Sequence, residues 1–337
     1  MSKNLMPLET FCNFENIYGD TKVYLKQPLN GTWKDYSWKE VGQEARKLAA
    51  AIRKMDLPEK SCIGLISKNC AHWIITDLAI WMSGHISVPL YPTLTTGSID
   101  QIVDHSEAKL LFVGKLDEWD SQLNGLKSDI KRVHFPFWEN KDCESWESFV
   151  GDCAPLMDFS FPKPDDVATI IYTSGTTGMP KGVVHTFDSI SFPAREALGE
   201  LGFCSTDRFI SYLPLSHIAE RLLIEIGALY GAGTVFFAES LDTFKDNLQE
   251  ASPTVFLAVP RIWLKFQQGI LAKVPQKKLN TLLSIPILGG LIKKKIRKQL
   301  GLNDVRVPIT GAAPIAADLL KWFSKLDINV MEVYGMT

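Results

Sequence analysis

The sequence predicts an α/β protein whose mostly parallel sheets carry helices on both faces. Short apolar strands alternate with amphipathic helices along most of the chain, and such alternation is typical of parallel sheets. A chain of 337 residues is longer than a domain with a single hydrophobic core usually is, so we expect two subdomains. Hydrophobic residues make up 46% and charged residues 22% of the chain, which is ordinary for a globular enzyme.

The elements of the first half follow from capping and periodicity. Ser37 and Glu40 have the spacing of a capping box, and apolar residues at helical spacing continue from Val41 to Ile52. Gly84 is expected to end a second helix. Strands are predicted at residues 62–66, 87–91, 109–113 and 167–171, and helices at 73–82 and 98–106.

The same alternation resumes in the second half of the chain. Residues 139–164, which precede it, are largely polar and contain proline, so we expect a connection there rather than an element. The apolar stretch 279–292 has 14 residues, fewer than the roughly 20 of a membrane-spanning helix. Strands are predicted at residues 208–212, 234–238, 254–259, 306–310 and 329–333, with helical patterns between most of them.

Charge and cysteine usage narrow the class of protein. The 36 basic and 38 acidic residues give a net charge of −2, so no global basic field indicates a nucleic-acid partner. The six cysteines show no zinc-ligand spacing. The N-terminus lacks the apolar segment of a secretory signal, and reduced thiols in a cytoplasmic protein are the simplest interpretation.

The run from Tyr172 to Lys181 has the composition of a phosphate-binding loop. It directly follows a predicted strand and combines two glycines, four Ser or Thr hydroxyls and one lysine. Glycine lets backbone amides approach an anion, hydroxyls donate hydrogen bonds, and lysine adds positive charge. The alternative is an ordinary polar turn.

The spacing within this run excludes several known phosphate loops. Gly175 and Gly178 are three residues apart, and Lys181 stands between Pro180 and Gly182. A Walker loop requires four residues between its glycines and a hydroxyl directly after the lysine. The glycine spacing also does not match the kinase glycine loop or the dinucleotide-binding fingerprint.

Three further motifs follow the loop, and each also has an ordinary structural explanation. His217, in the segment from Pro214 to Arg221, could simply satisfy a loop or cap a helix. The segment from Thr310 to Pro314 could be a plain strand-to-helix turn, with Pro314 at or near the first helical position. The third motif is Tyr334-Gly335-Met336-Thr337.

Together these motifs resemble those of the adenylate-forming superfamily, which contains acyl-CoA synthetases, luciferases and peptide-synthetase adenylation domains. Every position of its loop Thr-Ser-Gly-Thr-Thr-Gly-x-Pro-Lys-Gly is present from Thr173 onward. The Glu-Arg pair after His217, Tyr91-Pro92-Thr93 and the segment from Val259 to Trp263 resemble the long-chain fatty acid–CoA ligase branch.

The resemblance implies two packed, mostly parallel sheets with flanking helices, the incomplete large N-terminal domain of such an enzyme. Residues 1–337 would be a truncated AMP-binding domain, with one α/β subdomain at roughly 55–200, including the phosphate loop 172–182, and a second at roughly 1–54 plus 205–337. The chain ends at Thr337, one residue before the glutamate that helps to hold magnesium in relatives. We therefore expect an N-terminal fragment without the C-terminal lid domain and its catalytic lysine, so no residue of this chain is named as catalytic.

The resemblance also implies roles for individual residues. The ATP phosphates would be bound by Thr173, Ser174, Gly175, Thr176, Thr177, Gly178 and Lys181, and Thr173 would also contribute to a magnesium site. AMP and its adenine would lie against Gly311, Ala312, Ala313, Pro314, Tyr334, Gly335, Met336 and Thr337, with Thr337 on the α-phosphate. His217 would face the carboxylate in the acyl pocket.

The implied reaction is the joining of a fatty acid to coenzyme A, with ATP and Mg²⁺, through an acyl-adenylate. Two alternatives stay open: an acyl-AMP ligase that loads a carrier protein, and a nucleotide- or acyl-binding module without catalysis. We expect this chain by itself not to complete the reaction. The basic run Lys293–Lys298 suggests peripheral contact with the inner membrane surface, although a solvated helix face is the preferred explanation.

Overall fold

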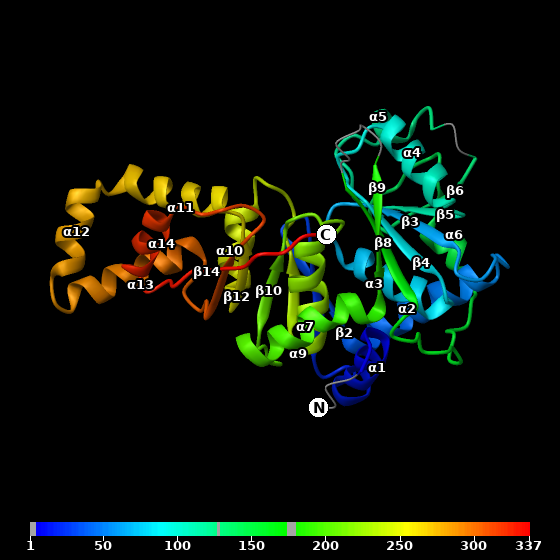
Figure 1. Ribbon diagram of the computed structural model, residues 1–337, viewed down its shortest axis with the longest axis horizontal. Helices are drawn as coiled ribbons and strands as arrows, with labels where there is room; N and C mark the ends of the chain where they lie inside the picture. Colours follow the sequence, from blue (N-terminus) through cyan, green and yellow to red (C-terminus); the bar gives the residue numbers. More distant parts are fainter. Residues whose placement is uncertain (1–4, 127–128, 174–179) are drawn as a thin grey trace.

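The computed structural model describes residues 5–126, 129–173 and 180–337, and these form two seven-stranded sheets with helices around them (Figure 1). The β8 sheet has the order β7 (Glu144–Ser145), β6 (Lys131–His134), β5 (Leu110–Val113), β3 (Cys62–Ile66), β4 (Ile86–Leu90), β8 (Val167–Thr173) and β9 (Lys181–Thr186). The β10 sheet has the order β14 (Met331–Glu332), β13 (Val307–Thr310), β12 (Val255–Ala258), β10 (Arg208–Ser211), β11 (Thr234–Phe237), β1 (Val23–Leu29) and β2 (Thr32–Ser37).

Both sheets are parallel except at one edge. The antiparallel neighbours are β1 with β2, and β8 with β9. The prediction of mostly parallel sheets is therefore confirmed, whereas the two antiparallel hairpins were not predicted. The division of the chain into subdomains at residues 54 and 205 stays a prediction, although β1 and β2 do join the strands that follow residue 205 in one sheet.

The helices cover the sheets, and the capping box predicted for α2 is present. The Ser37 side chain accepts a hydrogen bond from the Glu40 N–H at 3.2 Å, and the Ser37 N–H donates to the Glu40 carboxylate at 2.7 Å. The helices are α1 (Pro7–Tyr18), α2 (Trp38–Arg53), α3 (Ala71–Ser83), α4 (Thr96–Ser106), α5 (Trp119–Leu123), α6 (Trp146–Val150), α7 (Phe187–Leu201), α8 (Ile218–Glu220), the π-helix η1 (Arg221–Ile226), α9 (Gly227–Gly231), α10 (Phe244–Ala251), α11 (Pro260–Lys273), α12 (Gln276–Ser284), α13 (Leu288–Leu300) and α14 (Ala317–Ser324).

One hydrophobic core joins the two sheets, and α3 runs through it. Every residue of α3 is buried, and the helix contacts β1 of one sheet and β3 and β4 of the other. A helix that is buried on all sides needs packing partners on all sides, and the two sheets supply them. Trp73 of α3 and Phe209 of β10 belong to this same core.

A second core holds together a helical arm, which we define as α11, α12 and α13. Each helix contributes a buried residue to this core: Trp263 from α11, Leu279 from α12 and Ile296 from α13. Residues of β12 and α14 belong to the same core. In Figure 1 the arm extends from the β10 sheet to the left, away from the β8 sheet. No helix in the described ranges is long and apolar enough to cross a bilayer.

Two sequence-based expectations about elements are wrong. Residues 139–164 are not only a connection, because they contain β7 and α6, and Trp146 of α6 packs into the main core against His72 and Phe135. The polar neighbours of Trp146 conceal this anchor from a periodicity argument. Pro314 does not stand at the start of a helix, since α14 begins at Ala317. A turn at Ala312, whose φ is 65°, redirects the chain first.

Candidate active site

A cavity of about 550 Å³ lies where the carboxyl ends of strands from both sheets converge. Thr173 ends β8 of one sheet, and the segments that follow β10, β13 and β14 of the other sheet complete the wall. Ligands of open α/β sheets bind beyond the carboxyl ends of strands, so this is the expected position for a site. The described lining residues are Thr173, Val183, Pro193, Ala194, His217, Ile218, Ala219, Leu222, Leu223, Leu257, Gly311, Ala312, Val333, Tyr334, Gly335, Met336 and Thr337.

A second cavity of about 530 Å³ adjoins the first on the side of β4 and α4. Thr173, His217 and Thr337 line both cavities. These three residues therefore mark the junction at which a molecule in one cavity would meet a molecule in the other.

His217 stands at this junction as the N-cap of α8. Its Nδ1 accepts a hydrogen bond from the Ala219 N–H at 3.2 Å, and its ring packs edge-on against Tyr91. Burial lowers the pKa of His217 below its usual value, so the imidazole is neutral at pH 7. Because Nδ1 accepts, the proton of the neutral ring is on Nε2, which can donate to a ligand oxygen. His217 thus combines the capping role with a free donor, and the two explanations offered by the sequence do not exclude each other.

One lobe of the first cavity is apolar. Ala194 of α7, Leu222 and Leu223 of η1, and Leu257 of β12 face it. Each hydrogen bond of the π-helix η1 spans one residue more than in an α-helix. Such turns occur mostly as short bulges within α-helices, and they are frequent at functional sites. The sequence predicted an apolar helix here but not its π-turn. This lobe suits a hydrocarbon chain.

A flat shelf of small residues borders the other side of the cavity. A Cβ on Gly311 would lie 3.1 Å from Val333 Cγ2 and 3.2 Å from the Val333 carbonyl oxygen, so the strand end at β14 leaves little room for a side chain. Ala312 adopts a φ of 65°, a conformation that non-glycine residues rarely hold and that clusters at functional sites. Gly311 and Ala312 line the cavity, whereas Ala313 and Pro314 are exposed and lie outside its lining.

The last five residues of the chain form the remaining wall. The Val333 N–H donates to the Thr310 carbonyl at 2.9 Å, which brings the segment after β14 alongside Gly311. Tyr334, Gly335, Met336 and Thr337 all line the cavity, although the Tyr334 side chain is 89% exposed. The structure therefore brings together six of the eight residues predicted to contact AMP.

The described residues of the predicted phosphate loop lie at the end of β8 and the start of β9. The two strands are antiparallel, and Thr173 pairs with Lys181. A Cβ on Gly182 would lie 2.8 Å from Ile170 Cγ2, which explains why glycine follows the lysine. Lys181 is exposed and does not line either cavity in the described residues. Ser174, Gly175, Thr176, Thr177 and Gly178 lie outside the described residues.

Tyr172, which opens the same motif, lines the second cavity from β8. Its side chain is buried, and its hydroxyl is 2.8 Å from His105 Nδ1 on α4. Tyr91 and Gln101 line the second cavity nearby. Sequence reasoning placed Tyr91 in a motif that resembles the long-chain ligase branch but gave it no role, and no motif marks Gln101 or His105.

Glu220 and Arg221, the last two residues of the segment from Pro214 to Arg221, are wholly buried and connect the two sheets. Glu220 accepts hydrogen bonds from the Ser211 hydroxyl and the Tyr212 N–H, both at 2.9 Å and both at the end of β10. It also accepts one at 3.4 Å from the amide of Asn69, which lies between β3 and α3. Burial raises the pKa of Glu220 to about 8, and the hydrogen bonds from Ser211 and Tyr212 oppose that rise.

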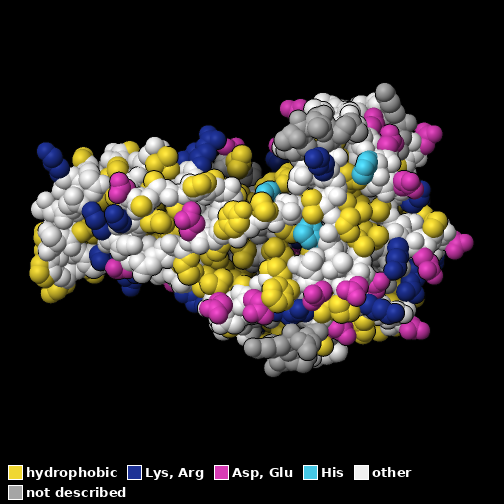
Figure 2. Space-filling model, in the orientation of Figure 1, with side chains coloured by type: hydrophobic (Ala, Val, Ile, Leu, Met, Phe, Trp, Pro, Cys, Tyr) yellow, Lys and Arg dark blue, Asp and Glu magenta, His cyan; other side chains and the backbone are white. Residues whose placement is uncertain are grey.

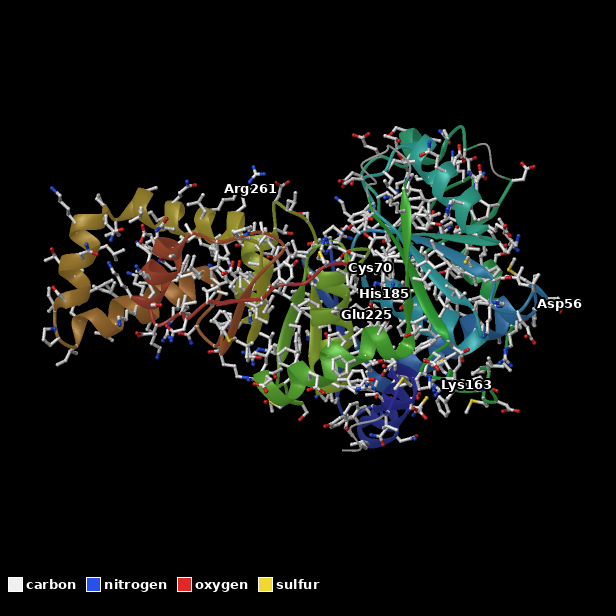
Figure 3. The ribbon with its side chains drawn as sticks, viewed as in Figure 1. Asp56, Cys70, Lys163, His185, Glu225 and Arg261 are labelled. Carbon is white, nitrogen blue, oxygen red and sulfur yellow. The ribbon has the colours of Figure 1, made fainter. Side chains whose placement is uncertain are left out.

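Arg221 makes the corresponding contacts toward the β8 sheet. It pairs with Asp77 of α3, lies 3.4 Å from a Glu225 carboxylate oxygen, and donates to the Thr169 hydroxyl of β8 at 3.0 Å. Burial and the Asp77 charge raise the pKa of Glu225 well above its usual value. Figure 3 places Glu225 in the middle of the molecule, where the sheets meet. The Glu-Arg pair is therefore part of the frame that holds His217 in place.

The described residues near Thr173 offer few ligands for a metal ion. The described lining of the two cavities contains no carboxylate, and no cluster of three His, Cys, Asp or Glu side chains occurs in the described part of the chain. Mg²⁺ is usually held by one or two carboxylates together with substrate phosphates and water. A single hydroxyl does not fit that ion by itself, so we derive no chemical step through magnesium, and the metal role of Thr173 stays a prediction.

Comparison with known proteins places the chain in a family. Residues 16–337 match the AMP-binding enzyme family. The chain is 31% identical over 368 residues to the long-chain-fatty-acid–CoA ligase ACSBG2 of Xenopus laevis, covering 96% of this chain and 49% of that protein. It is also 31% identical over 367 residues to the peroxisomal long chain acyl-CoA synthetase 6 of Arabidopsis thaliana, covering 96% and 52%. The chain thus spans about half the length of the curated relatives it matches.

Solved structures agree on the fold. The A domain of the carboxylic acid reductase of Segniliparus rugosus, in complex with AMP and a co-purified carboxylic acid, superposes with a TM-score of 0.81 at 19% identity, over 99% of this chain and 60% of that one. The anthranilate CoA ligase AuaEII, in complex with anthranoyl-AMP, gives a TM-score of 0.77 at 16% identity, over 100% and 61%. The match over residues 16–337 shows that this chain belongs to the AMP-binding enzyme family.

Proposed function

We propose that the protein containing this chain is an AMP-forming long-chain fatty acid–CoA ligase. The observation that carries the proposal is the cavity itself, in which an apolar lobe and a shelf of small residues meet at Thr173, His217 and Thr337. An acyl chain and a nucleotide would be joined at that point. The names of the relatives, which are long-chain ligases and synthetases, support the same substrate class.

The first half of the proposed reaction forms the acyl-adenylate. A carboxylate oxygen of the fatty acid attacks the α-phosphorus of ATP, a new O–P bond forms, and the bond to pyrophosphate breaks. The two anions repel each other, so the site must supply donors and hold the groups in line. In our proposal the Nε2–H of neutral His217 donates to the fatty carboxylate, the Thr173 hydroxyl and the Lys181 amine face the β- and γ-phosphates, and Thr337 contacts the α-phosphate.

The second half transfers the acyl group to a thiol. The coenzyme A thiolate attacks the acyl carbonyl, the C–S bond forms, and the C–O bond to AMP breaks. A fatty acyl-AMP ligase that loads a carrier protein uses the same first half and the same cavity. Thioester formation by the whole protein, with coenzyme A or with a phosphopantetheinylated carrier protein as acceptor, would separate these two candidates.

Calorimetric titration of this chain with a non-hydrolysable palmitoyl-adenylate analogue tests the site. We expect one equivalent to bind at least about 100-fold more tightly than either AMP or palmitate, because intermediate analogues combine the contacts of both substrates. Equal or absent binding would overturn the proposal. ATP–pyrophosphate exchange then distinguishes a ligase from a binding module, because only the former returns labelled pyrophosphate to ATP. We expect the whole protein to catalyse exchange and this chain alone to show little.

A further inference from the structure

The helical arm carries an extreme charge imbalance. Residues 261–303 contain ten of the chain's 36 Lys and Arg residues and none of its 38 Asp and Glu residues. The chain as a whole is slightly acidic, so this segment is a local basic region on an otherwise acidic protein. A basic region of this kind attracts anionic partners.

The far end of the arm is apolar. Four exposed aliphatic side chains, which we call the tip, lie where α12 leads into α13: Ile285, Ile287, Leu288 and Leu291. Ile287 is 87% exposed and Leu291 is 61% exposed. Figure 2 shows hydrophobic side chains at the left-hand end of the molecule, where Figure 1 places α12. Contiguous exposed apolar groups usually mark a contact surface, whereas scattered ones do not.

The backbone holds one of these side chains outward. Ile287 adopts a φ of 65°, which is unfavourable for a β-branched residue. Strained conformations of this kind persist where the surroundings impose them, often at functional positions.

The tip continues directly into a stripe of lysines on α13. Lys294, Lys295 and Lys298 are exposed and follow Leu291 by three, four and seven residues, so they share its face of the helix. Ile296, on the opposite face, is buried in the arm core. In the ranges that the structure describes, these three lysines make no ion pair, whereas Lys293 pairs with Asp327 at 2.8 Å.

We infer that the tip and the lysine stripe together bind an anionic lipid surface. Aliphatic side chains at one end of an amphipathic helix enter the acyl boundary, and adjacent lysines contact lipid phosphates. Nucleic acid would use the lysines but would leave the aliphatic tip exposed to water. Arg261 at the start of α11 points away from the protein as well (Figure 3). The inference goes beyond the proposed ligase activity and does not depend on it.

Vesicle co-sedimentation of this 337-residue chain, without ATP or fatty acid, tests the inference. The probes are phosphatidylcholine vesicles with and without 30% phosphatidylserine, at 50 mM and 500 mM NaCl. We expect the partition coefficient to be at least tenfold higher on the anionic vesicles at low salt, and high salt to reduce it. Replacing Lys294, Lys295 and Lys298 by Gln should lower it on the order of 100-fold, because each lysine contributes roughly fivefold near such a surface.

Two matched controls test whether vesicle binding depends on the arm or on exposed residues elsewhere on the surface. Lys54, Lys163 and Lys245 are exposed lysines outside the arm, and their triple Gln replacement should change binding less than twofold. Ile287→Ser with Leu291→Ser should reduce binding about tenfold or more, while Leu241→Ser, at an 88% exposed residue elsewhere, should not. Circular dichroism confirms that each variant is folded. No sedimentation, equal binding to neutral and anionic vesicles, or equal losses in the arm and control triples would each overturn the inference.

Discussion

His217 shows how one side chain can serve the fold and a ligand at once. Its Nδ1 caps α8 by accepting from Ala219, which leaves Nε2–H free at the junction of the two cavities. Seen alone, the residue is an ordinary capping histidine. The position of the ring between an apolar lobe and a shelf of small residues is what makes it a candidate donor to a carboxylate.

We expect His217→Ala to weaken binding of dodecanoate about tenfold or more, because a hydrogen bond to a charged group contributes roughly 1.5–3 kcal/mol. Calorimetric titration of the chain with the fatty acid in the presence of AMP measures this change. Leu241→Ala, on the exposed surface, is the control and should bind like the parent. Unchanged affinity in His217→Ala would exclude the residue from the acid pocket.

Glu220 gives a prediction about pH. Burial raises its folded pKa to about 8, whereas an unfolded glutamate has a pKa near 4.3. Between these values the native protein holds a proton that the unfolded chain has lost, so the stability associated with Glu220 is complete below pH ~4.3 and falls as pH rises toward 8. Glu220→Gln removes this site's contribution, and its free energy of unfolding should fall less steeply over that range, by up to about 1.4 kcal/mol per pH unit.

Urea denaturation at pH 5, 6, 7 and 8 measures the two slopes. Glu225 stays in both proteins, so its own contribution cancels in the comparison. Glu147→Gln, at an exposed position on α6, should run parallel to the parent. Parallel curves for Glu220→Gln as well would show that Glu220 is ionised in the folded protein at neutral pH.

Among the helices, η1 has the clearest consequence for function. Its π-turn places Leu222 and Leu223 side by side on the apolar lobe, facing α7 and β12. The wider turn of a π-helix reduces the rotation between successive residues, which brings the two leucines closer to one face than in an α-helix. Both leucines therefore contribute to the wall of the lobe.

We expect Leu222→Trp to weaken binding of a 16-carbon fatty acid about tenfold while leaving an 8-carbon acid within twofold. The larger ring fills the lobe that the distal carbons would occupy, and the shorter chain does not reach it. Titration with the two acids measures the ratio. Leu264→Trp, at an exposed position of α11, is the control. Equal losses for both acids would place the hydrocarbon chain elsewhere.

The protein as a whole depends on contacts between its two sheets, and Arg221 is central to them. Its side chain is fully buried, pairs with Asp77 and Glu225, and stacks near Trp73 and Trp81. Removing one partner of a buried ion pair leaves an uncompensated charge in a medium that solvates it poorly.

We expect Arg221→Met to lower the free energy of unfolding by roughly 3–5 kcal/mol. The double variant Arg221→Met with Asp77→Leu should recover part of that loss, since the buried carboxylate is removed as well. Lys26→Met, which breaks the half-exposed pair with Asp35, is the control and should cost no more than about 1 kcal/mol. Urea denaturation measures all three. If Arg221→Met lowered the free energy of unfolding no more than Lys26→Met does, Arg221 would not be central to the contacts between the two sheets.

Many strands and helices of this protein, and its family, can be predicted from short stretches of sequence. The capping box at Ser37, the strand Cys62–Ile66 and the strand–helix alternation are each encoded within a few residues, and all are present in the structure. The motifs also led to the family, and six of the eight residues that they predict to contact AMP line the cavity. Short-range patterns carry this information because capping and hydrophobic periodicity act within one element.

The remaining contacts depend on how distant segments of the chain pack together. The Glu220 contact to Asn69 and the Arg221 pair with Asp77 join residues 151 and 144 positions apart, and no periodicity predicts such partners. The buried anchor Trp146 and the meeting of the two cavities at His217 depend on chain crossings in the same way. Local chemistry was enough to predict most of the strands and helices and the family, because capping and periodicity act over a few residues. The walls of the site and the buried contacts around His217 depend on the packing of one sheet against the other, because those contacts form only after distant segments meet.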